Sequence, residues 1–403
     1  MPARFSRFRS LVPLVTAALV ACHDDAPTAP DLAAPETGLS LSTAAAAPAF
    51  VHLTEGISHT CGVTPDNRAY CWGDNHAGQL GDGTTTNRLV PRAVASGLRF
   101  RLVSAGWWFT CGLTTDDKAY CWGDNLDATL GDGGTEQTSL RPVAVAGGRR
   151  YRQLRTGNHH VCAVTFADVT VCWGANGRGQ LGAPTGNTDQ SNVPLQVVTG
   201  GLVFHRVIPG GAHTCALTAA NVAYCWGAND NGQLGNGSHT STTTPTLVSG
   251  TRSFNQMSAG LNHTCGVSGG KAYCWGVNFD GSLGDGTRNE RTVPTAVAGG
   301  LTFKGVNATF DNTCGITSSN RAYCWGRNAE GQVGDGTFGF RNSRTVPTKV
   351  VGGFTFVELG GATSSGHNCA VTPDERAYCW GGNPYGELGN GTLKKSPRPV
   401  PVG

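Results

Sequence analysis

The sequence predicts an all-β protein, a seven-bladed β-propeller in which each blade has four antiparallel strands and one disulfide. Three observations lead to this fold class: a Trp-Gly pair recurs seven times, each recurrence brings two cysteines, and 59 of the 403 residues are glycine. The seven tryptophans are Trp72, Trp122, Trp173, Trp226, Trp275, Trp325 and Trp380. A period near 50 residues with strand-like content is typical of propellers, and frequent glycine favours tight turns over helices.

Each repeat is expected to form one blade of about 51 residues, and seven of them fill residues 49–403. The second repeat shows the plan: strand A over 100–106, strand B over 110–114, a polar turn over 115–118, strand C over 119–123, a glycine-rich loop over 124–133 and strand D over 142–145. Pro142 suits an edge strand, where a missing N–H breaks no ladder bond. One blade alone exposes its faces, so seven must stack around an axis to bury them.

The alternating direction of the strands assigns the loops to faces. The A–B and C–D loops should share one face of the disc, named here the A–B/C–D face, and the B–C turns and D–A links should share the other. The chain enters the first blade near Phe50 and ends on a strand at 396–400. We expect this last strand to close the ring against the first blade; the alternative is that it completes the seventh.

Fourteen of the 15 cysteines form seven pairs, one in each repeat. The pairs are Cys61 with Cys71, Cys111 with Cys121, Cys162 with Cys172, Cys215 with Cys225, Cys265 with Cys274, Cys314 with Cys324 and Cys369 with Cys379. Cys61 and Cys71 are equidistant from Asp66 in a turn, so they should lie opposite each other, roughly 4.5–5.5 Å apart at Cα, as a disulfide requires. In the fifth repeat a two-residue Gly269-Gly270 turn preserves the opposition. The alternatives are reduced, packed thiols and metal sites, although two thiolates per blade leave zinc two ligands short.

Residues 1–22 are expected to be a lipoprotein signal peptide. Arg4, Arg7 and Arg9 precede an apolar stretch too short to span a bilayer, and the stretch ends in Leu-Val-Ala-Cys, which looks like a bacterial lipobox. Cys22 would then be lipidated and anchor an exported protein to the bacterial cell envelope; the alternative is an ordinary secretory signal with a chance cysteine. The proline-containing segment 23–48 is expected to be a flexible linker.

The repeats resemble those of the family named after the regulator of chromosome condensation. The fifth repeat carries the likeness in residues 258–267, 272–276 and 278–286, and the Gly-Gln-Leu-Gly element is complete at 78–81 and 232–235. The resemblance covers all seven repeats and implies a seven-bladed propeller. It does not imply one function, because the founding member is a nuclear exchange factor for the Ran GTPase that also binds chromatin, whereas secreted bacterial relatives include an inhibitor of β-lactamase.

Several function classes find no support in the sequence. The net charge is +3 and the body has no run of Lys or Arg, so nothing indicates nucleic-acid binding. No nucleophile–base pair, Walker loop or dinucleotide fingerprint is present, and we expect no catalytic residue and no cofactor. The oxygen-rich loops at 74–82 and 229–236 could suggest calcium, but they recur as family scaffold.

A histidine stands two positions before the strand B cysteine in five repeats, at His59, His160, His213, His263 and His367. A ring of histidines could suggest a metal. Adjacent blades hold them far apart, however, and the other two repeats carry Phe109 and Asn312 there. We therefore expect each histidine to hydrogen-bond the backbone of its own blade, and no metal.

The residues that depart from the repeat indicate where a partner would bind. On the A–B/C–D face we expect a binding surface made of Trp107, Trp108, Phe109, Leu126, Asp127, Arg178, Phe279, Asp280, Phe310, Asp311 and Tyr385. Aromatic side chains with interspersed charge anchor protein interfaces, and residues 338–341 are an insertion that lengthens one loop of this face. For Trp107 and Trp108 the alternative is packing between blades.

The sequence thus favours a monomeric, envelope-anchored protein that binds a protein or glycan partner through one propeller face. Two other classes stay open. A propeller enzyme, such as a lyase or hydrolase, would need polar residues converging on the central channel. A guanine-nucleotide exchange factor would need a cytoplasmic GTPase, and an exported protein would not meet one.

Overall fold

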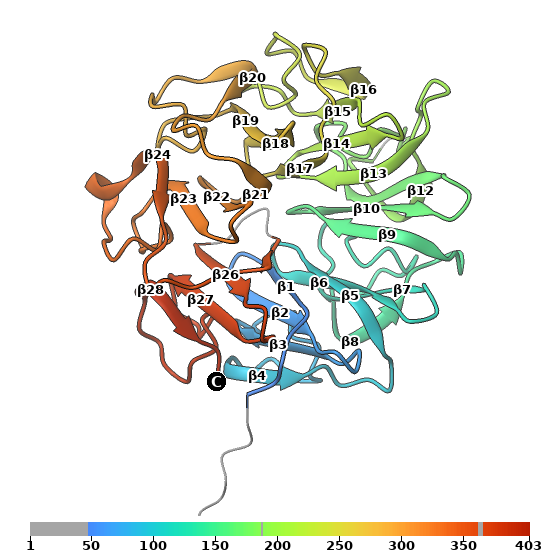
Figure 1. Ribbon diagram of the computed structural model, residues 1–403. Coiled ribbons are helices and arrows are strands. Elements are labelled where there is room, and N and C mark those ends of the chain that lie inside the picture. Colours follow the sequence, from blue (N-terminus) through green and yellow to red (C-terminus); the bar gives the residue numbers. More distant parts are fainter. Residues whose placement is uncertain (1–46, 187, 362–365) are drawn as a thin grey trace, which may run out of the picture. The chain divides into compact units, whose positions relative to one another are not determined.

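The structure, a computed structural model, describes residues 47–186, 188–361 and 366–403. Ala46–Gly403 form one compact unit, and within it seven four-stranded antiparallel sheets follow one another around a ring (Figure 1). This confirms the predicted fold class. The signal peptide, Cys22 and nearly all of the expected linker lie outside the described residues. Within the described ranges, no helix is long and apolar enough to cross a membrane.

The first three blades have these strands. The first comprises β1 (His52–Glu55), β2 (His59–Val63), β3 (Ala69–Gly73) and β4 (Arg88–Ala93). The second comprises β5 (Phe100–Ala105), β6 (Phe109–Thr114), β7 (Ala119–Asp124) and β8 (Thr138–Ala144). The third comprises β9 (Tyr151–Thr156), β10 (His160–Thr165), β11 (Thr170–Ala175) and β12 (Gln190–Gln196).

The remaining four blades repeat the plan. The fourth comprises β13 (Phe204–Pro209), β14 (His213–Thr218), β15 (Ala223–Gly227) and β16 (Thr242–Leu247). The fifth comprises β17 (Gln256–Ala259), β18 (His263–Ser268), β19 (Lys271–Gly276) and β20 (Arg291–Ala296). The sixth comprises β21 (Phe303–Ala308), β22 (Asn312–Thr317), β23 (Ala322–Gly326), the 3-10 helix η1 (Phe340–Asn342) and β24 (Arg344–Lys349). The seventh comprises β25 (Glu358–Leu359), β26 (His367–Val371), β27 (Ala377–Gly381) and β28 (Ser396–Pro401).

The last strand completes the seventh blade, so the expectation that it closes the ring against the first blade is wrong. β28 pairs with β27, because each of the seven sheets consists of four consecutive strands and none is one strand short. Side-chain packing and a few backbone hydrogen bonds between the first and seventh blades close the ring instead. Trp72 of the first blade packs with Leu388 and Val402 of the seventh, and its indole N–H donates to the Glu387 carbonyl at 2.8 Å.

The cysteine pairs occupy the predicted register and all seven are disulfides. In every blade the two cysteines are direct partners across strands B and C. The bridges join Cys61 to Cys71, Cys111 to Cys121, Cys162 to Cys172, Cys215 to Cys225, Cys265 to Cys274, Cys314 to Cys324 and Cys369 to Cys379. Their Cα atoms are 4.0–4.1 Å apart, closer than the expected spacing.

The shorter turn of the fifth blade preserves this register, as predicted. Gly269 and Gly270 both have positive φ, at 55° and 77°, which a two-residue type I′ hairpin needs. Cys265 and Cys274 are consequently direct partners even though they are 9 residues apart instead of 10.

The hydrophobic core lies between blades rather than within them. Trp122 of the second blade is fully buried and packs with Phe100 of its own blade and with Val63 and Leu80 of the first. The centroids of the Phe100 and Trp122 rings are 5.6 Å apart. A Cβ on Gly112 would lie 2.7 Å from Phe100 Cδ1, so this glycine makes room for the ring. Each blade therefore depends on its neighbour for burial.

Backbone hydrogen bonds confirm the predicted assignment of loops to faces. The N–H of Asp74, at the start of a C–D loop, donates to the carbonyl of Ser58 in an A–B loop at 2.8 Å. On the other side, the N–H of Phe100, which ends a D–A link, donates to the carbonyl of Asn67 in a B–C turn at 2.8 Å. The A–B loops therefore lie beside the C–D loops on one face, and the B–C turns lie beside the D–A links on the other, as strand direction predicts.

Candidate partner-binding face

The A–B loop of the second blade presents two tryptophans, each half-buried. The Trp107 ring lies 4.7 Å from the His159 ring of the third blade, and the Trp108 ring lies 5.3 Å from the His76 ring of the first. The two indoles are 5.9 Å apart. The four rings form a continuous aromatic row, named here the tryptophan row, which crosses three blades on the A–B/C–D face. The indoles pack between neighbouring loops and still reach the surface.

Carboxylates fix both ends of the tryptophan row. Asp127 Oδ2 lies 2.7 Å from His159 Nδ1, and Asp74 Oδ2 lies 2.7 Å from His76 Nδ1. Among the residues that the structure describes, the buried Trp107 Nε1 has no hydrogen-bond partner. Aromatic rings held with low rotamer freedom are well suited to anchor a partner.

Phe109 does not belong to this surface, and its assignment to it was wrong. Its side chain is 1% exposed and packs with Leu154, Val161 and Trp173 between the second and third blades. The reason is its position two residues before the strand B cysteine. In five other blades a histidine fills this position at the boundary, or seam, between two blades, and these are named here the seam histidines. Trp107 and Trp108 remain at the surface because they precede the strand.

The seam histidines bond a neighbouring blade, which corrects the expectation that each would bond its own backbone. His59 Nε2 lies 2.9 Å from Thr110 Oγ1 of the second blade. The Thr110 hydroxyl donates to the Gln79 carbonyl at 3.0 Å, so it accepts from His59 Nε2–H. The other four histidines meet Thr214, Thr264, Thr313 and Thr60 in the same way. Burial lowers the pKa of His59 to about 3, so the ring stays neutral.

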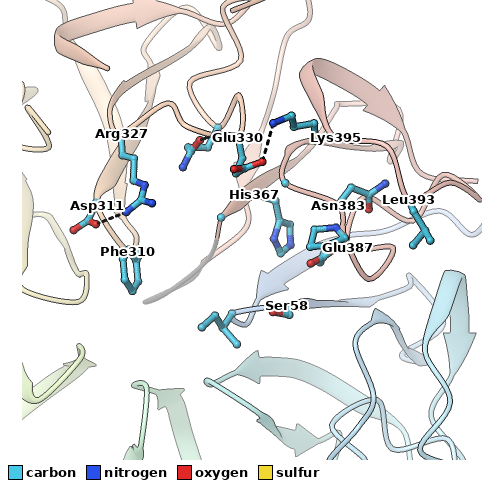
Figure 2. Close-up of a pocket in the computed structure, with 15 residues that line it drawn as sticks. Ser58, Phe310, Asp311, Arg327, Glu330, His367, Asn383, Glu387, Leu393 and Lys395 are labelled. Atoms are coloured by element: carbon cyan, nitrogen blue, oxygen red, sulfur yellow. Dashed lines mark hydrogen bonds and ion pairs between the residues drawn. The ribbon is translucent and has the colours of Figure 1, made fainter. Parts of the chain in front are cut away.

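A pocket of about 740 Å³ opens on the same face between the sixth, seventh and first blades (Figure 2). The side chains of Phe310 and Asp311, both predicted site residues, line it. Asp311 pairs with Arg327 at 3.4 Å, and across the pocket Glu330 pairs with Lys395 at 3.1 Å. The wall therefore alternates apolar surface with two ion pairs.

The inserted loop of the sixth blade borders this pocket. Phe338 and Phe340 are 53% and 64% exposed, and each covers a cation of the pocket wall. Lys395 Nζ lies 4.7 Å from the Phe338 ring centroid, and the Arg327 guanidinium lies 4.9 Å from that of Phe340. The insertion thus places two exposed aromatic rings over cations of the pocket wall without lining the pocket itself, through contacts that the sequence does not reveal.

Only Phe310 and Asp311 of the pocket lining were predicted from the sequence, and among the residues that were missed Glu387 carried a signal. Glu387 stands where Gln completes the Gly-Gln-Leu-Gly element elsewhere, and this departure from the repeat could have been noticed. Burial raises its pKa to about 7. Lys395 offered no such signal, because only the fold brings it opposite Glu330.

The remaining predicted residues lie on the same face but apart from these two clusters. Leu126, Phe279 and Tyr385 are 59%, 72% and 42% exposed in the C–D loops of three different blades. Arg178 forms an exposed ion pair with Asp230 of the next blade at 3.3 Å, and Asp280 lies 3.9 Å from Arg288. The face as a whole carries most exposed aromatic side chains of the described chain, with Phe166 in a B–C turn as the exception.

The oxygen-rich loops are organised by their own side chains. The buried Asn75 amide donates to Asp82 Oδ1 at 3.2 Å and to the Thr84 carbonyl at 2.9 Å, and Arg88 pairs with Asp82 at 2.6 Å. A donor amide and a guanidinium therefore occupy the positions beside Asp82 where calcium would need oxygen. Among the described residues, no group of three or more His, Cys, Asp or Glu could hold a metal ion.

Solved structures with a similar fold include Prp20p, the RCC1 of Saccharomyces cerevisiae, at 20% identity and a TM-score of 0.73 over 89% of this chain and 87% of that one. Human WBSCR16 matches at 19% identity and a TM-score of 0.70, over 79% of this chain and 85% of that one. At these identities the likeness shows the fold alone.

Among curated proteins, the ultraviolet-B receptor UVR8 of Arabidopsis thaliana is 29% identical over 219 residues, which are 53% of this chain and 49% of UVR8. The probable E3 ubiquitin-protein ligase HERC4 of Homo sapiens is 36% identical over 101 residues, 25% of this chain and 10% of the ligase. The matches therefore span half or less of these relatives. The family model for the RCC1-like domain matches residues 26–364, and the model for the regulator of chromosome condensation (RCC1) repeat matches residues 362–387. The chain belongs to the RCC1-like domain family.

Proposed function

We propose that this propeller is a binding protein without enzymatic activity, exported and held at the cell envelope by lipid on Cys22, and that its A–B/C–D face binds a protein partner. The anchor and the location rest on the signal-like residues 1–22. Binding through a propeller face is consistent with the family. Solved structures of yeast RCC1 include a complex with Kap60 and a study of its binding to Gsp1p and histones.

One observation carries the choice of face: the concentration of held, accessible aromatic groups on it. The tryptophan row offers two indoles flanked by histidines that contact carboxylates. The pocket between the sixth and first blades adds Phe338 and Phe340 over paired cations. Aromatic anchors surrounded by polar groups are the usual composition of interface hot spots. The opposite face consists of short turns and links.

The test immobilises residues 49–403 and compares partner capture from envelope extracts with that of a Trp107→Ala/Trp108→Ala variant. Losing two hot-spot side chains costs about 2 kcal/mol or more, so partners should bind about 30-fold more weakly. Phe166→Ala is the matched control, because it removes an exposed aromatic from the other face. Equal capture by the tryptophan variant, or loss on Phe166→Ala, contradicts the choice of face.

The anchor is tested separately by metabolic labelling with a palmitate analogue. The full chain should incorporate label and sediment with membranes, and Cys22→Ser should do neither. Label on the serine variant, or none on the parent, would overturn the assignment of Cys22 without touching that of the face.

A further inference from the structure

The seven inner strands line the central channel, and their side chains satisfy the backbone of neighbouring blades. Gln256 of β17 donates to the Val306 carbonyl at 2.8 Å and accepts from the Val306 N–H at 3.0 Å. Ser258 accepts from the Ala308 N–H at 3.0 Å. These bonds cover strand edges that would otherwise stay unpaired. Short polar residues at the channel therefore stabilise the fold by bonding the backbone of the next blade.

Arg155 departs from this rule. It lies opposite Cys162 in the sheet, at the position that Thr54, Ser104, Ser258 and Asn307 fill in other blades. Its side chain crosses the channel, since a Cβ added to Gly361 of the seventh blade would lie 3.7 Å from Arg155 Nη1. Among the described residues, the Arg155 guanidinium has no hydrogen-bond or ion-pair partner. This arginine spans the channel and forms no hydrogen bond to the backbone of a described residue, so its presence needs another explanation.

A pocket of about 430 Å³ surrounds Arg155 within the channel. Three further cationic or titratable groups line it, namely Arg152, His205 and Arg206, and so do the amides of Gln153, Gln256 and Asn307 and the hydroxyls of Ser104, Thr156 and Ser258. None of its described lining residues is Asp or Glu. The volume falls within the range of small-molecule pockets.

The positive charge in this pocket is only partly compensated. Asp168 pairs with Arg152 and lies 3.8 Å from His205 Nδ1. Arg206 donates to the uncharged Asn255 carbonyl at 2.7 Å, which leaves its charge and that of Arg155 without a carboxylate within ion-pair distance among the described residues. Glu358, the acid that attracts Arg155, is engaged by His52 at 2.6 Å. Burial and then Arg206 lower the pKa of Arg155, and Glu358 opposes them.

We propose that the central channel binds a small oxyanion, a molecule bearing a carboxylate or a phosphate, between Arg155 and Arg206. Guanidinium forks bind both groups through paired hydrogen bonds, and the amides and hydroxyls of the wall supply further donors. Arg155 lies near the end of β9 and Arg206 near the middle of β13, so this site lies inside the channel, along the inner strands. Its lining includes no residue of the proposed partner-binding surface, so the two proposals are tested independently.

The test measures heat of binding to the full chain at fixed ionic strength, with citrate and inorganic phosphate as probes and glucose as the neutral control. Saturable binding of citrate, of phosphate or of both supports the proposal, and the tighter probe identifies the favoured anion class. Arg155→Gln should weaken it at least about tenfold, the scale of one lost charge-assisted contact. Arg155→Lys keeps the charge but loses the fork, so it should weaken binding less.

Arg376→Gln is the matched control, because it removes the same charge from an exposed turn of the seventh blade, where Arg376 pairs with Asp374 at 3.1 Å, and it should bind like the parent. If Arg155→Gln does not fold, Arg206→Gln carries the test with the same expectation, since its side chain is exposed. No saturable binding of either anion, or equal affinity in the parent and the two glutamine variants at Arg155 and Arg206, overturns the proposal.

Discussion

The seam between the first two blades and the seam between the second and third solve one packing problem with different chemistry. In the first, His59 donates to the Thr110 hydroxyl, and this hydroxyl and the Trp122 indole both donate to the Gln79 carbonyl. In the second, Phe109 replaces the histidine and Val161 replaces the threonine. The Thr129 carbonyl there accepts from the Trp173 indole at 2.9 Å. The two facing positions of a seam are thus either both polar or both apolar, because a buried polar group needs a hydrogen-bond partner.

The seams that depart from the polar plan adjoin the two candidate clusters. Phe109 directly follows the tryptophan row. At the seam between the sixth and seventh blades, Asn312 turns back to Thr309 at 2.6 Å, and Asn368 supplies the bond to the Gln332 carbonyl at 2.8 Å. Asn312 directly follows Phe310 and Asp311 of the pocket. We infer that the changes in these two loops are coupled to the changes in the seams beneath them.

The largest expected effect is loss of stability in acid, because the polar seams bury neutral histidines. Burial lowers the pKa of His59, His160, His213 and His367 to about 3 and that of His263 to about 4. Between these values and 6.5 the unfolded chain binds protons that the folded chain does not. The free energy of unfolding should therefore fall as pH drops below 6.5, by up to about 1.4 kcal/mol per pH unit for each histidine.

Converting the first seam into the second isolates this effect. His59→Phe/Thr110→Val should have a shallower acid slope than the parent in urea unfolding between pH 6.5 and 4. Above pH 6.5 the free energy of unfolding of the variant should change with pH in parallel with that of the parent. An unchanged acid slope would show that the buried histidines do not govern acid stability.

A smaller effect is expected from mismatching the apolar seam. Phe109→His alone buries an imidazole N–H opposite Val161, where no acceptor replaces the threonine hydroxyl, and an unsatisfied buried group costs about 1–3 kcal/mol. Adding Val161→Thr should return most of this loss. The measurement is a double-mutant cycle by denaturant unfolding at pH 7. Additive losses, with no coupling between the two sites, would contradict the matched-pair account.

An effect with the opposite dependence on pH is expected where the ring closes. Glu55 of the first blade is 1% exposed and its Oε1 accepts from the Cys369 N–H of the seventh at 2.7 Å. Burial raises its pKa to about 8, so between pH 4.5 and 8 the unfolded chain releases a proton that the folded chain retains. This contribution to stability falls as pH rises. Glu55→Gln should unfold like the parent near pH 4.5 and be more stable by about 1 kcal/mol or more at pH 8. A constant difference across this range would contradict it.

Most of the fold follows from the sequence because repetition multiplies each weak signal. Seven nearly equal spacings predict the blades, and the symmetric position of Cys61 and Cys71 around Asp66 predicts the disulfide register. Strand direction alone predicts which loops share a face. The partner of His59 was missed because it lies 51 residues away, in a neighbouring blade that a single-repeat argument does not contain.

The candidate sites were predicted less completely for the same reason. Departures from the repeat correctly placed Trp107, Trp108, Phe310 and Asp311 on one face. They could not separate a departure that serves the seam, such as Phe109, from one that serves the surface. The Arg155 pocket was missed because only the ring brings the third blade opposite the seventh.

Site-specific photo-crosslinking in cells tests the central claim, that the A–B/C–D face binds the partner, most directly. A photoreactive residue would replace Phe279 or Tyr385 on that face, and Phe166 on the other; all three side chains are exposed, so folding should be unaffected. The account predicts discrete protein adducts from Phe279 or Tyr385 and none from Phe166. Adducts from Phe166 alone, or equally from all three positions, would contradict it.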